Sequence, residues 1–222
     1  MLVLQLPVVS LCMRARLWAL STGARIRRPC GTSTAGTPHA VASAGFGATV
    51  IDSYERGRPT YSEVDTELLL RSSGACDNST TPAAGLYPAR PILELACGTG
   101  KFTRPLVRTL ERIGGPGTAA NVLLVDPAGM GAHAAATFPK LPFVRTTADS
   151  LGHLADGSVH AVVAAQAFHW FADSASLREI SRVIRPRGQL LLIWNKRDRD
   201  ASPLMAALEA LQYSMNRTLW LT

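Results

Sequence analysis

The segment that most constrains this chain is a short apolar run that stops at a glycine-rich turn. Ile92, Leu93 and Leu95 form the run, and Gly98 and Gly100 follow it. An apolar run bounded by turn residues is typical of a strand buried inside a parallel sheet. Glycine at such a turn permits positive φ and lets a ligand approach the backbone. The free N–H groups at the start of the next helix favour an electron-rich group such as a carboxylate.

Further apolar runs alternate with helical patterns along the rest of the chain. Strands are expected over 122–125, 143–146, 159–165 and 189–194, and helices over 99–112, 130–137, 174–184 and 203–213, with a turn at 186–188. Strands that alternate with helices at this spacing predict βαβ units and a parallel sheet. The expected fold is therefore α/β, a Rossmann-like doubly wound sheet of mostly parallel strands.

The residues before this pattern are less regular. Residues 46–61 are polar and contain Gly57 and Pro59, so we expect a loop there. Ser62 or Asp65 is expected to cap a short helix that runs through residues 68–70. Residues 72–90 have the composition of a linker. We therefore expect an amino-terminal segment followed by a linker over residues 46–90, one domain over 91–213 and a tail over 214–222.

The amino-terminal residues 1–45 contain no acid and carry five arginines, which supply +5 of the net charge of +7. This composition is typical of a transit peptide, and a disordered extension is the alternative. A secretory signal fits less well because the arginines follow the apolar run. We expect a cytoplasmic or mitochondrial location. The rest of the chain carries a net charge of only +2, which gives little support to a nucleic-acid partner. No apolar run approaches the roughly 20 residues that a membrane span needs.

The four cysteines form no CxxC pair, and none stands at metal-ligand spacing to a histidine; they are Cys12, Cys30, Cys76 and Cys97. This usage indicates a reducing compartment and predicts neither a disulfide framework nor a metal site.

Asp126 ends the second expected strand of the 91–213 domain. An acid at this position can accept both hydroxyls of a ribose, although an ordinary acid that caps a turn is the alternative. A nicotinamide dinucleotide would require glycine at the third position of its fingerprint, where Thr103 stands, and Glu94 does not belong to that fingerprint.

The motifs as a set resemble class I S-adenosylmethionine-dependent methyltransferases of the type 11 group. Residues 94–100 are similar to motif I, E-x-A-x-G-x-G, and residues 166–171 are similar to the signature A-Q-A-x-H-W-F. Residues 54–61, 148–150, 156–158 and 179–188 extend the resemblance, which lies closest to the subgroup of trans-aconitate methyltransferases. The chain departs from the family pattern at two positions. His160 replaces the usual Asp or aromatic residue, and Arg187 stands where the family often has glycine.

The resemblance implies S-adenosyl-L-methionine as the cofactor and assigns roles by residue. Glu94, Gly98 and Gly100 would contact its methionine part, with Ala96 and Thr99 in the same turn. Asp126 would hold the ribose, and Asp149 with Ser150 would frame the adenine. The remaining assignments are Gln166 and Ala167 facing the methyl donor, Tyr54 and Arg58 covering the cofactor, and Tyr61, Phe168 and Trp170 on the substrate side.

Methyl transfer is an in-line displacement, so the protein mainly has to align the nucleophile with the methyl group. An ionised carboxylate needs no base, whereas an amine, hydroxyl or carbon nucleophile can need one. His169 is the candidate for that base, and a packed structural histidine is the alternative. Core packing is likewise the alternative for Phe168 and Trp170.

The resemblance also implies two more strands after the 203–213 helix, whereas the sequence stops at Thr222. We therefore expect a sheet without its last two strands, in which the strand at 189–194 is an exposed edge. Two functions follow. The first is an active methyltransferase that acts on a small molecule, such as a carboxylic acid. The second is a cofactor-binding but inactive paralogue that acts as a partner protein.

Overall fold

The structure is a computed structural model that describes residues 2–7, 48–73, 91–127, 129–195, 202–208 and 210–211. The expected linker up to residue 90, the tail over 214–222 and most of the amino-terminal extension lie outside the described residues.

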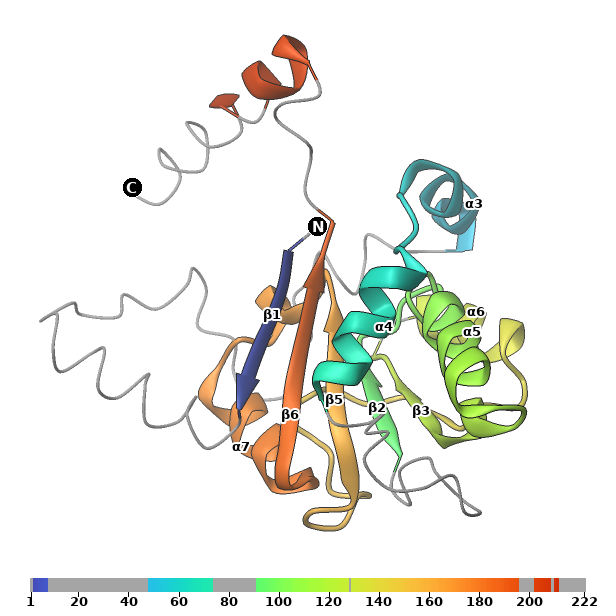
Figure 1. Cartoon of the computed structure of the whole chain (residues 1–222), viewed down its shortest axis with the longest axis vertical. Helices are drawn as coiled ribbons and strands as arrows, with labels where there is room; N and C mark the ends of the chain where they lie inside the picture. The colour runs from blue at the N-terminus through green and yellow to red at the C-terminus, as the bar shows by residue number, and fades with distance from the viewer. Residues whose placement is uncertain are drawn as a thin grey trace, which may run out of the picture.

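One six-stranded sheet, in the order β1-β6-β5-β2-β3-β4, forms the centre of the molecule (Figure 1). Five strands are parallel: β2 (Ile92–Leu95), β3 (Val122–Val125), β4 (Phe143–Val144), β5 (Val159–Ala165) and β6 (Ile184–Trp194). In chain order these five are arranged 3-2-1-4-5, which confirms the doubly wound α/β fold. The strand order reverses at β2, which pairs with β3 on one side and β5 on the other. Ligands of such sheets bind at the carboxyl ends of the strands beside this reversal.

The edge of β6 differs from the expectation. Strand β1 (Leu2–Pro7) pairs with it antiparallel, from Leu2 opposite Trp194 to Pro7 opposite Gln189. The edge of the parallel sheet is therefore covered by the chain's own amino-terminal residues, which satisfies the backbone groups that an open edge would expose. Residues 2–7 thus belong to the sheet. The hypothesis that the rest of the extension is a transit peptide stays a prediction.

Helices pack on both faces of the sheet because the strand side chains alternate between two apolar clusters. On one face, Ile92 and Leu124 pack with Leu69 and Leu70 of α4 (Glu63–Ser72) and with α5 (Thr103–Gly114). Ala134 of α6 (Gly129–Thr137) joins this cluster. On the other face, Leu93 and Leu95 pack with Ile180 and Val183 of α7 (Ser174–Val183). A short helix, η1 (Thr118–Asn121), precedes β3.

Residues 48–57 form helix α3 (Ala48–Gly57), so the expected loop over 46–61 was wrong there. Gly57 and Pro59 are the helix-breaking residues of this stretch, and both stand at its end, where they stop the helix without disturbing its interior. The next helix, α4, begins as predicted at Ser62, whose hydroxyl accepts a hydrogen bond from the Asp65 N–H at 3.4 Å. Asp65 itself lies in the first turn of α4 and is not the cap.

The predicted turn at 186–188 occurs inside β6 as a bulge. Val159 pairs with Ile184, and the next pair joins Ala161 to Gln189, so the residues between them loop out of the ladder. Arg187 has a positive φ of 66° there, the conformation that glycine adopts most readily. The helix expected over 203–213 is present in the described residues 203–208 and 210–211.

Candidate cofactor site

The turn after β2 has backbone angles that few side chains tolerate. Ala96 and Gly98 have φ of 55°, and Gly100 has φ of 86°. A Cβ on Gly100 would lie 2.7 Å from Cε2 of Phe138, so this position has no room for a side chain. The Cys97 N–H donates to the Val125 carbonyl at 3.2 Å and ties the turn to β3. These contacts explain why α5 begins at Thr103 and not at residue 99.

Asp126 follows β3 and meets the turn directly. The Gly98 N–H donates to Oδ2 of Asp126 at 2.9 Å, and the side chain is almost fully buried. The structure therefore brings the glycine-rich turn and the strand-end acid together at the carboxyl edge of the sheet, beside the reversal of strand order. A carboxylate has about four lone-pair sites, so the bond to Gly98 leaves capacity for hydroxyl donors of a ligand.

Glu94 lies in β2 beneath this turn and is fully buried. Its Oε2 accepts a hydrogen bond from the Thr103 hydroxyl at 2.9 Å, whereas its Oε1 has no hydrogen-bond partner among the described residues. Burial raises the pKa of Glu94 to about 8, and the Asp126 charge adds to this. The Glu94 carboxyl is therefore mostly protonated at pH 7, and a cation placed beside it would lower its pKa and favour the carboxylate.

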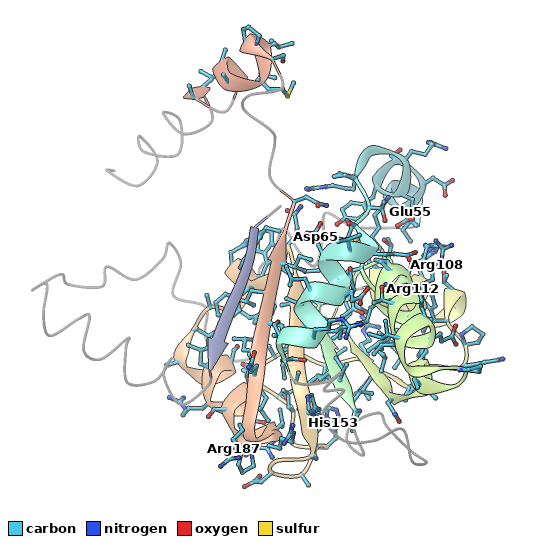
Figure 2. All side chains as sticks on the ribbon, viewed as in Figure 1. Glu55, Asp65, Arg108, Arg112, His153 and Arg187 are labelled. Carbon is cyan, nitrogen blue, oxygen red and sulfur yellow. The ribbon has the colours of Figure 1, made fainter. Side chains whose placement is uncertain are left out.

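Helix α3 is attached to the glycine-rich turn by polar contacts. The Thr99 hydroxyl donates to the Glu55 carboxylate, and Nζ of Lys101 donates to the carbonyls of Glu55 at 2.6 Å and Arg58 at 2.7 Å. The Arg58 guanidinium lies over the Tyr54 ring, 5.4 Å from its centroid. The segment predicted to cover the cofactor is therefore positioned over the turn, as Figure 2 shows for Glu55 at the upper end of the sheet.

The aromatic residues assigned to the substrate side have different surroundings. Tyr61 is buried in the core and packs edge-to-face on Phe102, with ring centroids 5.1 Å apart. Phe168, in the short helix η2 (Phe168–Trp170), packs in the same manner on Phe171 beside the α7 cluster. Trp170 is 43% exposed, so of the three it is the one with a large open surface. Tyr61 and Phe168 both pack against other aromatic rings. For Phe168, this is the packing role that the sequence left open as the alternative to lining the substrate pocket.

Gln166 and His169 follow the carboxyl end of β5 in the chain. Gln166 has a positive φ of 55°, and its backbone N–H donates to the Ile193 carbonyl at 2.9 Å. Strained non-glycine residues of this kind cluster at ligand sites. His169 is exposed beside Trp170, with ring centroids 4.8 Å apart, and partial desolvation lowers its pKa. A neutral imidazole is therefore present at pH 7 at this end of the sheet.

The comparisons with known proteins agree with this geometry. Residues 93–192 match the family model described as a methyltransferase domain. An uncharacterized methyltransferase of Mycobacterium tuberculosis is 39% identical over 157 residues, which are 70% of this chain and 54% of the relative. Another from Schizosaccharomyces pombe is 34% identical over 68% of this chain and 52% of the relative.

The segment over residues 93–192 is therefore similar to the domain of S-adenosylmethionine-dependent methyltransferases. The crystal structure of a putative S-adenosylmethionine-dependent methyltransferase from Methanococcus maripaludis has a similar fold, with a TM-score of 0.53 at 13% identity over 86% of this chain and 79% of that one. The chain spans about half the length of the curated relatives that it matches.

The residues at the site fit the cofactor of this family, S-adenosyl-L-methionine. The cofactor carries an ammonium and a sulfonium, and Glu94 offers a buried oxygen without a partner in the described chain. It has no pyrophosphate, so a third glycine is not required, and Thr103 uses that position to bind Glu94. Among the described residues, no group of three or more His, Cys, Asp and Glu side chains could hold a metal ion.

Gly131 in α6 is a contact of Asp126 that sequence reasoning missed. A Cβ on Gly131 would lie 2.6 Å from Cβ of Asp126 and 2.8 Å from the Phe143 ring. We expect Gly131→Ala to displace the carboxylate and to weaken binding of S-adenosylhomocysteine by about tenfold, together with an overpacking cost of about 1–3 kcal/mol in stability. Calorimetry measures the first effect and thermal unfolding the second. Gly129→Ala, in the same helix with open space around it, is the control, and equal affinities of the two variants would refute the contact's role.

Lys101 is a second residue without a sequence signal, because its partners lie more than forty residues away in the chain. Its ammonium binds carbonyls at the carboxyl end of α3, where a positive charge is favoured. We expect Lys101→Met to loosen α3 and to speed dissociation of S-adenosylhomocysteine by at least about tenfold, because two charge-assisted hydrogen bonds are lost. Stopped-flow displacement measures this rate, with the exposed Lys140→Met as the control. Unchanged dissociation would show that α3 does not retain the ligand.

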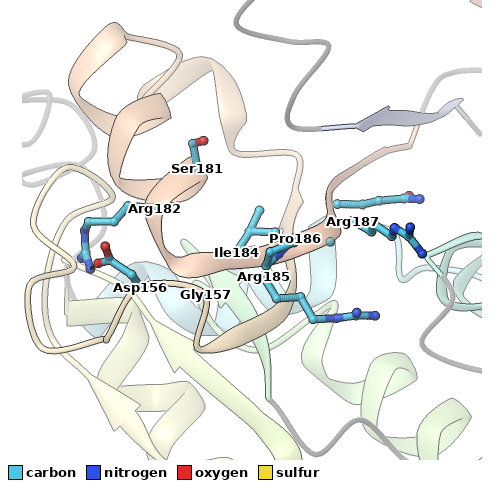
Figure 3. A pocket seen from close by; sticks show the side chains of 10 residues that line it. Asp156, Gly157, Ser181, Arg182, Ile184, Arg185, Pro186 and Arg187 are labelled. Atoms are coloured by element: carbon cyan, nitrogen blue, oxygen red, sulfur yellow. Dashed lines mark hydrogen bonds and ion pairs between the residues drawn. The ribbon is translucent and has the colours of Figure 1, made fainter.

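A hollow of about 760 Å³ lies elsewhere, between the end of α7 and the β6 bulge (Figure 3). Arg185 and Arg187 line it, and Figure 2 shows Arg187 at the opposite end of the sheet from Glu55. Nearby, His160 is buried and its Nδ1 accepts a hydrogen bond from Nε of Arg185 at 3.0 Å, so His160 has a structural role. Separately, no helix in the described part of the chain is both long and apolar enough to cross a bilayer.

Proposed function

We propose that this chain binds S-adenosyl-L-methionine at the carboxyl edge of β2 and β3 and transfers its methyl group to a small molecule. The contact of the Gly98 N–H with the Asp126 carboxylate carries this proposal, because it joins the turn and the acid at the reversal of strand order. The unpartnered, buried oxygen of Glu94 beneath them supports it.

Each group then has a defined task. Asp126 accepts the two ribose hydroxyls in charge-assisted hydrogen bonds. Glu94 becomes a carboxylate toward the ammonium of the methionine part, and Ala96, Gly98, Thr99 and Gly100 shape the turn around that part. Asp149 and Ser150 frame the adenine, and Gln166 faces the methyl donor. Tyr54 of α3 and Arg58, just after α3, close over the cofactor.

The bound cofactor supplies a methyl group activated on a sulfonium. The chain's own residues orient the acceptor in line with that methyl group and exclude water from it. His169 takes a proton when the acceptor is an amine or a hydroxyl, and has no proton to take from an ionised carboxylate.

A small carboxylic acid is the acceptor class that we propose. Arg58 is exposed at the site, and none of the described acids forms an ion pair with its guanidinium. A free guanidinium can bind one carboxylate of a substrate while a second carboxylate accepts the methyl group. The sequence resemblance to trans-aconitate methyltransferases points to the same class. Trp170 provides exposed apolar surface on the substrate side.

Calorimetry with S-adenosylhomocysteine, followed by a methylation assay, tests the proposal. The assay uses S-adenosylmethionine with panels of small dicarboxylic acids, amines and alcohols. We expect binding, no affinity for NAD, and methyl ester formation on members of the acid panel. Binding without turnover on any panel would support the inactive partner protein instead, and absence of binding would refute the cofactor site itself.

A further inference from the structure

We propose that Arg182 of α7 is a positioning residue for the adenine end of the cofactor site. It acts through the backbone that carries Asp149 and Ser150, and it does not itself reach the ligand. This inference rests on the proposed function, in which Asp149 receives the adenine amino group.

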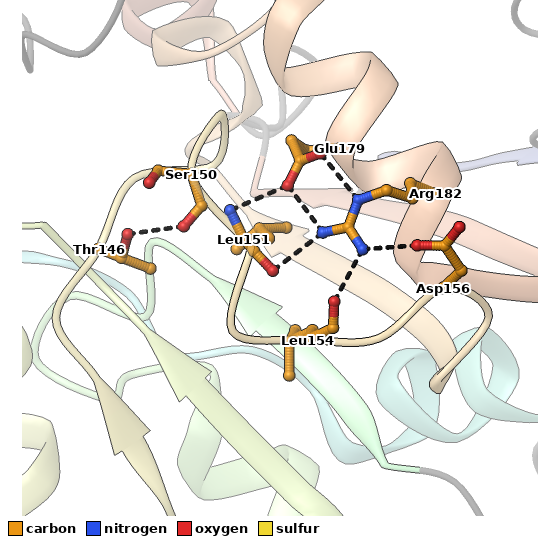
Figure 4. Close-up of polar contacts among 7 residues, drawn as sticks. All are labelled: Thr146, Ser150, Leu151, Leu154, Asp156, Glu179 and Arg182. Carbon is orange, nitrogen blue, oxygen red and sulfur yellow. Dashed lines mark hydrogen bonds and ion pairs between the residues drawn. The ribbon is translucent and has the colours of Figure 1, made fainter.

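The Arg182 guanidinium makes five hydrogen bonds, one for each of its N–H donors (Figure 4). Its Nε and one terminal nitrogen bind the two carboxylate oxygens of Glu179, each at 2.8 Å. The same terminal nitrogen donates to the Leu151 carbonyl at 3.0 Å. The other terminal nitrogen donates to the Leu154 carbonyl at 2.7 Å and to Asp156 at 2.8 Å. Four of the five bonds therefore go to backbone carbonyls and to a bidentate partner on the same helix.

Leu151 is held on both sides by this pair. Its N–H donates to Oε2 of Glu179 at 3.1 Å, and its carbonyl accepts from Arg182. The Leu151 side chain is fully buried in the apolar cluster that contains Ile180 and Val183 of α7, so the side chain is held in place as well as the backbone. The peptide planes before and after Leu151 are thus set by α7, so the residue just before it, Ser150, has little freedom.

The restraint reaches Asp149 through a short turn. The Ser150 N–H donates to the Thr147 carbonyl at 3.1 Å, and the Ser150 carbonyl accepts from the Thr146 hydroxyl at 2.9 Å. The Asp149 carboxylate makes no hydrogen bond or ion pair with any residue that the structure describes. Its position depends on the backbone of this turn, and that backbone is anchored at Leu151 by Glu179 and Arg182.

The carbonyl contacts, and not the ion pair to Asp156, account for the restraint. The Asp156 side chain is 81% exposed, where an ion pair contributes little. The Arg182 and Glu179 side chains are 27% and 24% exposed, and the two carbonyls would lose their donors if Arg182 were shortened. A lysine keeps the charge but cannot supply five donors in a planar fork. Arg182→Lys is therefore a partial, charge-conserving disruption, and Arg182→Met is a full one.

The test compares two ligands that differ only at the adenine amino group, S-adenosylhomocysteine and S-inosylhomocysteine. The intact chain is expected to prefer the adenosyl ligand by about tenfold or more, the effect of one hydrogen bond to a charged group. Arg182→Met should reduce this preference to less than threefold, with Arg182→Lys intermediate. Arg178→Met, on the exposed face of the same helix, is the control and should keep the full preference.

The outcomes separate positioning from general stability. If Arg182→Lys and Arg182→Met weaken both ligands equally and the preference stays intact, Arg182 supports the fold only and the inference is overturned. An intact chain that does not distinguish the two ligands also overturns it. Should Arg182→Met not fold, the same preference measured on Arg182→Lys and Glu179→Gln decides. Failure of the intact chain to bind either ligand would refute the proposed cofactor site, which is a different result.

Discussion

Replacing Asp126 by alanine is expected to weaken binding of S-adenosylhomocysteine by at least about tenfold, and by up to a thousandfold if both ribose hydroxyls bind the carboxylate. The carboxylate lies at 2.9 Å from the Gly98 N–H and is almost fully buried, so no other side chain can take its place without rearrangement. Titration calorimetry measures the affinity. Glu111→Ala, on the exposed part of α5, is the control for a lost surface charge.

The bond to Gly98 means that Asp126→Ala also loosens the turn, and a second ligand separates the two effects. S-adenosylhomocysteine without its ribose 2′-hydroxyl should bind the intact chain about tenfold or more weakly, yet bind Asp126→Ala as well as the complete ligand does. An equal loss from removing the hydroxyl in both proteins would show that Asp126 shapes the turn and does not hold the ribose.

Glu94 is expected to make the stability of the ligand-free chain fall as the pH rises from about 5 to about 8. Burial raises its pKa in the folded state to about 8, whereas the pKa of an unfolded glutamate is about 4.3. Between these two pKa values, Glu94 keeps its proton in the folded chain but has lost it in the unfolded chain. The free energy of unfolding is therefore highest below about pH 4, and it falls as the pH rises through the folded pKa. The total loss is on the order of a few kcal/mol.

Glu94→Gln removes this titration and should flatten the fall. His160 and His169, whose pKa values are lowered, change stability in the opposite direction below pH 6.5, so the difference between the two proteins isolates Glu94. Denaturant unfolding at several pH values measures it, and parallel profiles for the two proteins would contradict the assignment. Cofactor binding to the intact chain at pH 7 should also release a proton, which calorimetry in two buffers counts, and Glu94→Gln should release none.

Local sequence patterns predicted most of the sheet and its helices. Strands β2, β3 and β5 lie at the residues expected, because an apolar run between turn residues is a signal contained in a few neighbouring positions. The cap of α4 at Ser62 is equally local. Helix α3 does not follow from the sequence pattern, because Gly57 and Pro59 are typical of a loop. At the end of a helix, such residues only set its boundary.

The contacts that complete the site could not be predicted, because they join positions distant in the chain. Gly131 resembles any helical glycine until Asp126 is found beside it. Lys101 binds the carbonyls of α3 across more than forty residues, and β1 pairs with β6 from the opposite end of the sequence. Such pairings depend on tertiary placement, for which one sequence carries no periodicity or spacing rule.

A crystal structure of the chain with S-adenosylhomocysteine tests the central claim most directly. The account predicts the ribose hydroxyls on Asp126, the methionine part against the turn at 96–100 above Glu94, and the adenine beside Asp149. A ligand bound at the opposite edge of the sheet, in the hollow beside Arg185 and Arg187, would contradict it.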